Sequence, residues 1–311
     1  FRFSLKQIEH IPFPKRISQD FFAIEQPEAR RVFHGRGHCY PGYEHLVLDW
    51  YPPLLLVSAY APLEEVDVIL QCLESVDQHQ QIATILLQER HLTQSPSQVL
   101  RGELPDKLIV SENGLKYEVR PGRQQNAGLF MDTRLLRQWL QRNSENSKVL
   151  NLFAYTCSLS VAALAGGASS VVNVDVSKTS IAWGKRNHDL NGQDPRAVRS
   201  IPHNLFTSWG RVKQYGRYDI VIIDPPTRQR GSFDAEKDYG TVVRKIGKCC
   251  TPGAKIIAAL NSPFLGEEFL HAQIARHLSE ARFVEQIPVS PEYEESESGK
   301  GLKICLFQLP G

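Results

Sequence analysis

Two aspartates in this chain each end an apolar run rich in β-branched residues, as residues 171–174 precede Asp175 and residues 221–223 precede Asp224. Runs of this kind are typical of parallel strands that are buried on both faces. Pro225 and Pro226 follow Asp224 and cannot donate to a strand ladder, so they end the second run. We therefore expect both carboxylates at the carboxyl ends of central strands, where open α/β sheets bind their ligands. There they can accept hydrogen bonds from hydroxyls or amines.

The elements that must position Asp175 are a strand, a turn and a helix. Residues 149–153 predict the strand, 154–158 the turn and 159–164 a helix that Gly166-Gly167 closes. Asp175 follows this turn by about 20 residues, the usual place for a carboxylate that accepts from ribose hydroxyls. A pyrophosphate-binding turn would have glycines at its first, third and sixth positions, and this turn has none. Adenosine without a phosphate fits better, and S-adenosylmethionine is such a ligand.

Segments around these residues resemble one family of enzymes. Residues 150–156, 175–177 and 224–227 look like the class I methyltransferases that modify large-subunit ribosomal RNA, and 125–134 resembles a further segment of theirs. The most similar branch methylates guanine or cytosine in 23S rRNA. The resemblance covers Gly114 to Gly311 well and Arg30 to Asp106 more loosely. It implies a Rossmann-like α/β domain, a parallel sheet with an antiparallel last strand, preceded by a small α+β domain.

The resemblance also implies which residues hold S-adenosylmethionine. They come from the turn, the strand ends and the upstream segment: Asn151, Phe153, Ala154, Tyr155, Thr156, Asp175, Val176, Ser177, Asn204, Leu205, Asp224, Phe130, Asp132 and Arg134. Asn204 stands where the family often has an acid, and its amide can still accept from the adenine amine. Ser177 is expected to cap a helix over 178–190. Asp132 and Arg134 are compatible either with a brace over the cofactor or with a plain charge pair at a helix start.

Four residues are expected at the target base: Asp224, Pro225, Pro226 and Asn261. Methylation of carbon 5 of a pyrimidine needs a thiolate that first attacks the ring. The family's cytosine branch has that cysteine just past the strand after Asp-Pro-Pro, whereas residues 256–264 here contain none. We therefore expect direct transfer to a base nitrogen, with guanine favoured.

Three residues after Asp224 are expected to contact RNA: Arg228, Arg230 and Phe233. Guanidinium groups suit phosphate contacts and an aromatic ring suits base stacking, and a mobile surface loop is compatible with both roles. The segment 34–38, with two histidines and an arginine between glycines, is either a basic turn or a second RNA contact.

Composition sets the wider limits. The 311 residues suit two domains, and we expect an arm over 1–29, a small α+β domain over 30–110 and a methyltransferase domain over 111–311 that opens with a hairpin at Asn113-Gly114. No apolar run approaches the roughly 18 residues of a membrane span. Six cysteines without a Cys-x-x-Cys pair favour a reducing cytoplasm and no bound metal. An acidic loop over 292–297 is expected to be solvated.

Two observations keep other functions open. The net charge is only +2, so any attraction for RNA must be local. Cys157 stands where the family's turn has glycine, and its side chain is expected to crowd the cofactor. Both favour a catalytically weak or retired RNA-binding or assembly factor with the same fold, and the charge also permits a methyltransferase for a small molecule or a protein. The intact Asp175 and Asp224-Pro225-Pro226 favour an RNA-modifying enzyme.

Overall fold

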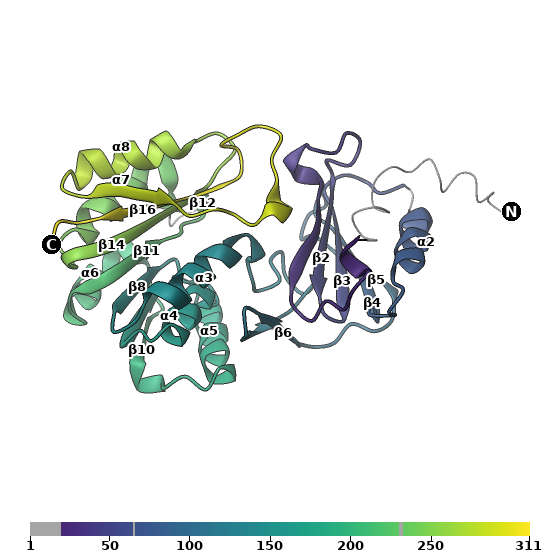
Figure 1. The fold of residues 1–311 in the computed structure, drawn as a ribbon, viewed down its shortest axis with the longest axis horizontal. Coiled ribbons are helices and arrows are strands. Elements are labelled where there is room, and N and C mark those ends of the chain that lie inside the picture. Colours follow the sequence, from purple (N-terminus) through teal and green to yellow (C-terminus); the bar gives the residue numbers. More distant parts are fainter. Residues whose placement is uncertain (1–19, 65, 230–232) are drawn as a thin grey trace, which may run out of the picture. The chain divides into compact units, whose positions relative to one another are not determined.

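The computed structural model describes residues 20–64, 66–229 and 233–311 (Figure 1). By its internal contacts the chain divides into two compact units. The first holds the described residues up to Met131 together with Pro291–Ser296, and the second holds Asp132–Ser290 and Glu297–Gly311.

The first unit is built on a five-stranded sheet with the order β1-β2-β3-β4-β5. These strands are β1 (Arg30–His34), β2 (Leu46–Tyr51), β3 (Leu54–Ala59), β4 (Thr84–Glu89) and β5 (Ser97–Arg101). Only β3 and β4 are parallel, and the crossover between them carries helix α2 (Val66–Val76). The helix buries Ile69, Leu73 and Val76 in the core of this unit, as its apolar spacing predicts. Strand β5 is an edge strand that pairs with β4 in antiparallel orientation.

The predicted hairpin is present as β6 (Leu108–Glu112) and β7 (Leu115–Val119). Its two turn residues, Asn113 and Gly114, have φ of 52° and 76°, as a two-residue turn of this twist requires. The hairpin belongs to the first unit, and the units part between Met131 and Asp132 rather than near residue 110.

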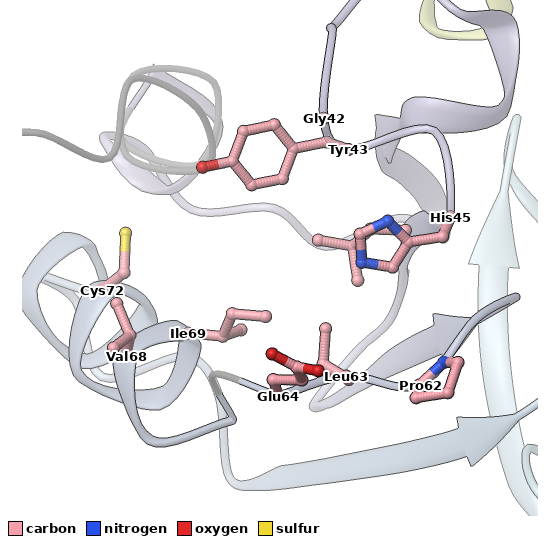
Figure 2. A pocket seen from close by; sticks show the side chains of 10 residues that line it. Gly42, Tyr43, His45, Pro62, Leu63, Glu64, Val68, Ile69 and Cys72 are labelled. Carbon is pink, nitrogen blue, oxygen red and sulfur yellow. The ribbon is translucent and has the colours of Figure 1, made fainter.

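A groove of about 420 Å³ lies within the first unit (Figure 2). Tyr43 and His45 line it from the loop before β2, Leu63 and Glu64 from the loop before α2, and Ile69 from α2 itself. None of the site residues expected from the sequence lines this groove.

The second unit has a seven-stranded sheet with the order β10-β9-β8-β11-β14-β16-β15. The strands are β8 (Lys148–Leu152), β9 (Ser170–Val174), β10 (Val198–Ile201), β11 (Tyr218–Ile223), β14 (Cys250–Asn261), β15 (Arg282–Gln286) and β16 (Leu302–Gln308). The first five in this order are parallel, and β16 is antiparallel to both of its neighbours. This is the predicted Rossmann-like sheet with an antiparallel last strand.

In the part of the chain that the structure describes, six helices cover the two faces of this sheet (Figure 1). On one side lie α3 (Arg134–Asn143), α4 (Ser158–Ala165) and α5 (Lys178–Leu190), and on the other α6 (Leu205–Gln214), α7 (Ala235–Ile246) and α8 (Glu267–His277). The strand order reverses at β8, because the chain runs outward through β9 and β10 and returns to β11 on the other side. Such a reversal opens a crevice at the carboxyl ends of β8 and β11.

The acidic loop between β15 and β16 is not a solvated turn, which corrects our expectation. Its residues Pro291–Ser296, here called the strap, pack on β1 as part of the first unit. Glu292 pairs with Arg30, and the guanidinium of Arg31 lies 4.4 Å from the ring centre of Tyr293. The strap is therefore held by ion pairing and by cation–π contact.

His34 also joins the strap to β1. Burial and the charges of Arg31 and Arg36 lower the pKa of His34 to about 3, so its imidazole is neutral. Its Nδ1 lies 2.8 Å from Arg31 Nη1 and must accept, which leaves Nε2–H to donate to Glu295 Oε1 at 3.4 Å. His34, the first histidine of the predicted basic turn, therefore has a structural partner on each nitrogen.

Candidate functional site

The turn between β8 and α4 has an unusual backbone. Phe153, Tyr155 and Cys157 have φ of 59°, 46° and 63°, a left-handed region that costs a non-glycine residue on the order of 1 kcal/mol or more. This conformation directs the Tyr155 N–H to Asp175 Oδ2 at 2.8 Å, and Ser177 N donates to Asp175 Oδ1 at 2.8 Å. Each oxygen of Asp175 keeps a further lone pair. The carboxylate is thus fixed at the end of β9 and can still accept from two hydroxyls.

The surroundings of Asp175 set its electrostatics. Burial raises the pKa of its carboxyl group, and the two backbone N–H donors act in the opposite direction. Burial and the charge of Asp175 raise the pKa of Tyr155 to about 12, so that phenol stays protonated. Ser177 caps α5 as predicted, because its Oγ accepts from Ser180 N at 3.1 Å.

Asp224 lies at the carboxyl end of β11, one strand across from the turn. Burial and the carboxylate of Asp132 raise the pKa of Asp224 to about 7, and the Arg137 guanidinium acts in the opposite direction. Asp132 lies in a short 3₁₀ helix (Met131–Thr133), and Arg137 lies in the following α3. The fold thus brings two carboxylates and one guanidinium to the crevice.

Sequence reasoning missed Arg137. The residue is fully buried, and its Nη1 donates to Thr133 Oγ1 at 2.7 Å and to Ser158 Oγ at 3.3 Å. The sequence could have indicated Arg137, because this cationic residue lies on the same buried helix face as Leu136 and Leu140. A buried guanidinium on an apolar face needs partners from other elements, so the position points to a site.

These charges fit a cationic cofactor. When Asp224 is ionised, its carboxylate and that of Asp132 can both attract a positive group in the crevice. Asp175 adds acceptors of the kind that ribose hydroxyls need. The residues present therefore fit S-adenosylmethionine, which has both a sulfonium and a ribose with free hydroxyls.

Asn151 and Asn204, both expected at the cofactor, have hydrogen bonds within the protein. Asn151 is buried in β8 and donates to Asn173 Oδ1 in β9 at 3.0 Å. Asn204 caps α6, where its Oδ1 accepts from Phe206 N at 2.8 Å. The adenine contact of Asn204 stays a prediction, and the hydrogen bond from Asn151 to Asn173 braces the two strands below the turn.

Cys157 does not occupy the place that we expected. Its side chain is buried and is directed at α5, where a Cβ added to Gly184 would lie 2.3 Å from Cys157 Sγ. Gly184 therefore provides the space that the thiol fills. The expectation that this side chain crowds the cofactor is corrected, because the thiol packs against a helix instead.

Two loops meet on the side where a substrate base is expected. Thr227 Oγ1 donates to the carbonyl of Asn261, which ties the loop after β11 to the end of β14. Pro226 and Asn261 are exposed there, and Pro225 is buried. This edge holds all four residues that we expected at the target base.

The expected RNA contacts have separate outcomes. Arg228 is 81% exposed, and its Nε lies 3.9 Å from Asp234 Oδ2. Phe233 is only 3% exposed, because it packs on Phe153 at 4.9 Å between ring centres and stacks on Phe206. The prediction that Phe233 offers an exposed stacking surface is wrong. Arg230 lies outside the described residues.

The remaining predicted cofactor residues lie in the turn, beside Asp175, or at the starts of α3 and α6, and one lies in the first unit. Ala154 and Thr156 are buried in the turn, Val176 is exposed beside Asp175, Leu205 opens α6, and Arg134 opens α3. Phe130 is 43% exposed and belongs to the first unit.

The described residues contain no cluster of three or more side chains that could ligate a metal ion. In the same part of the chain, no helix is long and apolar enough to span a membrane.

Comparison with known proteins identifies the family to which this chain belongs. Residues 30–308 match the family profile described as S-adenosylmethionine-dependent methyltransferase. A ribosomal RNA large subunit methyltransferase K/L of Shewanella pealeana is 38% identical over 160 residues, which are 50% of this chain and 22% of the relative. Another, of Shewanella sp. MR-4, is 31% identical over 227 residues, 70% of this chain and 32% of the relative. The chain thus spans about a fifth to a third of the length of these relatives.

Solved structures share the fold. One described as a methyltransferase complexed with S-adenosylhomocysteine has a TM-score of 0.82 at 24% identity, covering 99% of this chain and 83% of its own. The tRNA m1G37 methyltransferase of M. jannaschii has a TM-score of 0.61 at 14% identity, with 85% of this chain and 72% of its own covered. At these identities the likeness concerns the fold alone.

Proposed function

Because this chain belongs to the S-adenosylmethionine-dependent methyltransferases, we propose that it methylates a base nitrogen of RNA, with a guanine of 23S ribosomal RNA as the favoured target. The relatives named above are ribosomal RNA large subunit methyltransferases, which supports this class of substrate. The observation that carries the proposal is Asp224 beside an exposed edge that has no thiol. Such an enzyme would act in the cytoplasm, where ribosomal RNA is modified.

The cofactor supplies an electrophilic methyl group on a positively charged sulfur. Asp175 accepts from the ribose hydroxyls, and the negative charge of Asp132 and Asp224 favours the sulfonium. The protein mainly positions the two reactants, because the transfer is an in-line displacement. This assignment uses the ends of β9 and β11 together with Asp132 of the short 3₁₀ helix before α3.

On the substrate side, Asp224 can accept a hydrogen bond from an amine or ring N–H of the base. The amide of Asn261 is exposed next to it and can orient the base edge. A guanine presents both donors and acceptors on that edge, which suits a carboxylate and an amide together. A nitrogen nucleophile uses its own lone pair, so no covalent intermediate with the protein is needed.

The cysteines support direct transfer. Cys157 is packed against α5, Cys249 and Cys250 lie at the start of β14, and Cys305 is fully buried in β16. Cys39 and Cys72 belong to the first unit. The starting end of β14 is opposite the edge that holds Asp224, because β11 and β14 are parallel. No described thiol of the second unit is placed to attack a base at that edge.

Two sequence observations, Cys157 and the low net charge, left other functions open, and the structure removes the first. The position of Cys157 in the turn favoured a catalytically retired RNA-binding factor. Its side chain, however, packs against Gly184 of α5. A small-molecule or protein substrate is still permitted by the net charge of +2. The test must therefore compare substrate classes.

Transfer of tritiated methyl groups from S-adenosylmethionine provides this test. We expect label in an unmodified 23S rRNA transcript, and none with Asp224→Ala. Arg228→Ala should weaken RNA binding and lower the slope of log K against log salt by about 1, because one phosphate contact is lost. Arg199→Ala removes another exposed arginine of the same unit and serves as the matched control. Label that goes only to protein or to small molecules would replace the RNA proposal.

A further inference from the structure

One large apolar side chain of the second unit is almost completely exposed. Phe264 has 89% of its surface in solvent and follows the end of β14 by three residues. A single exposed apolar side chain is common on protein surfaces and by itself implies no function. A role for Phe264 must therefore be argued from the turn that holds its backbone and from the position of this turn beside the proposed site.

The turn that carries Phe264 is fixed by polar contacts. Ser262 is 1% exposed, and its Oγ accepts from the backbone N–H of Phe264 at 3.2 Å and of Leu265 at 3.3 Å. The carbonyl of Ser262 accepts from Lys303 Nζ, which also donates to Gly299 O at 2.7 Å. Lys303 is itself 2% exposed and comes from β16. The ring is thus presented to solvent by a turn that Ser262 and Lys303 of β16 hold in place.

This turn adjoins the residues that we place at the target base. Ile223 and Ala258 are register partners in β11 and β14, so the two strands reach the same edge of the sheet. The hydrogen bond from Thr227 to the carbonyl of Asn261 then joins the loop of Asp224 to the segment that leads to Phe264. An exposed guanidinium, Arg228, follows Thr227 directly. An aromatic face and a cation beside a base site suit unpaired nucleotides, whose bases stack and whose phosphates are anionic.

We propose that Phe264 stacks on an unpaired base of the RNA that flanks the target nucleotide, and so positions the target base at Asp224. The inference rests on the proposed function, because it needs an RNA substrate. It also supplies the stacking surface that Phe233 was expected to offer and does not. Phe264 is a positioning residue here, since it acts on a neighbouring base and not on the reacting atoms.

The test compares three variants of Phe264 in the methyl-transfer assay with a 23S rRNA transcript. Phe264→Ala should raise the KM for RNA about tenfold, the size expected for loss of one base–aromatic stack. Phe264→Tyr should restore the wild-type KM, and Phe264→Leu should not, because it is apolar without an aromatic face. Affinity for S-adenosylhomocysteine and the thermal midpoint should stay unchanged in all three, since the ring makes little contact with the protein. Val284→Ala, at a 49% exposed apolar side chain of β15, is the matched control.

Each other outcome overturns the inference in a distinguishable way. An unchanged KM in Phe264→Ala would show that the ring does not touch the RNA, while the proposed function stands. Rescue by leucine as complete as by tyrosine would show simple apolar contact instead of stacking. Loss of affinity for S-adenosylhomocysteine would show a structural role. Absence of RNA methylation by the wild-type protein would remove both the proposed function and this inference.

Discussion

The carboxyl group of Asp224 has a pKa close to neutral pH, so small changes in pH alter its charge. Burial and Asp132 raise its pKa to about 7, although Arg137 acts in the opposite direction. A ligand with a positive sulfonium beside Asp224 should favour its ionised form, and a ligand that lacks only the methyl group and this charge should not. S-Adenosylmethionine and S-adenosylhomocysteine are such a pair.

The preference for S-adenosylmethionine over S-adenosylhomocysteine should therefore rise as the pH increases from 6 to 8. Below the pKa, Asp224 is protonated and offers no charge to the sulfonium. Isothermal titration calorimetry with both ligands at several pH values measures this ratio. Asp224→Asn should make the ratio independent of pH, and a ratio that stays flat in the wild-type protein would disprove the placement of Asp224.

The same shift predicts how stability depends on pH. The folded-state pKa of about 7 lies above the ordinary value of 3.8, so the folded protein binds the proton more tightly than the unfolded chain. The contribution of Asp224 to the free energy of unfolding is complete below pH 4 and is lost as the pH rises towards 7 and beyond. Urea unfolding without ligand should show this loss in the wild-type protein and a smaller one in Asp224→Asn. Equal pH dependence of the two proteins would contradict it.

Asp175→Ala should weaken the binding of S-adenosylhomocysteine by about tenfold to a hundredfold. The substitution removes a charged acceptor for two hydroxyls, and hydrogen bonds to charged groups contribute about 1.5–3 kcal/mol. Asp189→Ala, at an exposed aspartate of α5, provides the calorimetric control. An unchanged affinity in Asp175→Ala would remove the ribose from this position.

Single residues could be predicted where local sequence determines their place. Asp175, Asp224 and Ser177 follow apolar runs, and the end of a buried strand fixes where they lie. Arg137 and Phe233 could not be placed in this way, since their surroundings come from distant elements: Ser158 for Arg137, and Phe153 and Phe206 for Phe233.

At the scale of elements, the left-handed turn and helix α5 fit each other. Cys157 adopts φ of 63°, where glycine is less strained, and its thiol fills the space over Gly184. A side chain at both positions would place two atoms closer than contact distance. The missing glycine in the turn is thus matched by a glycine in the helix.

Gly184→Ala should lower the free energy of unfolding by about 1–3 kcal/mol, the usual range for overpacking. In the Cys157→Gly background the same substitution should cost much less, because the clashing thiol is gone. Urea denaturation of the two single variants and the double variant gives the coupling energy. Additive effects would show that the two residues do not contact each other.

Other elements followed from pattern alone. The hairpin was predicted from Asn113-Gly114, and the parallel strands from their apolar, β-branched runs. Strand β5 was not predicted, because it has mainly polar and exposed side chains and is an edge strand whose pairing with β4 the sequence does not show. Its formation depends on a neighbour and not on its own composition.

At the scale of the whole molecule, the chain passes between the two units three times, because the strap returns to the first unit. The acidic composition of this segment indicated a solvated loop. Its partners Arg30, Arg31 and His34 lie more than 250 residues earlier, as the separations of 262 for Arg30–Glu292 and 261 for His34–Glu295 show. Such distant pairing cannot be inferred from one sequence.

Tyr293→Ala should loosen the edge of the first unit. The ring loses its cation–π contact with Arg31, worth about 0.5–2 kcal/mol, and its packing on His34. Hydrogen exchange of the β1 amides should become several-fold faster, while that of β8 and β9 should not change. Tyr293→Phe keeps the ring and Glu294→Ala changes an exposed neighbour in the strap, so both should resemble the wild type. Equal exchange rates in Tyr293→Ala would show that the strap does not stabilise β1.

The central claim, methylation of an RNA base nitrogen by direct transfer, is tested most directly by identifying the product. An unmodified 23S rRNA transcript is incubated with the protein and S-adenosylmethionine, digested to nucleosides and analysed by mass spectrometry. We predict a methylguanosine carrying the new methyl group on nitrogen, absent from the Asp224→Ala reaction. A 5-methylpyrimidine product, or a covalent adduct with 5-fluoropyrimidine RNA, would contradict the account.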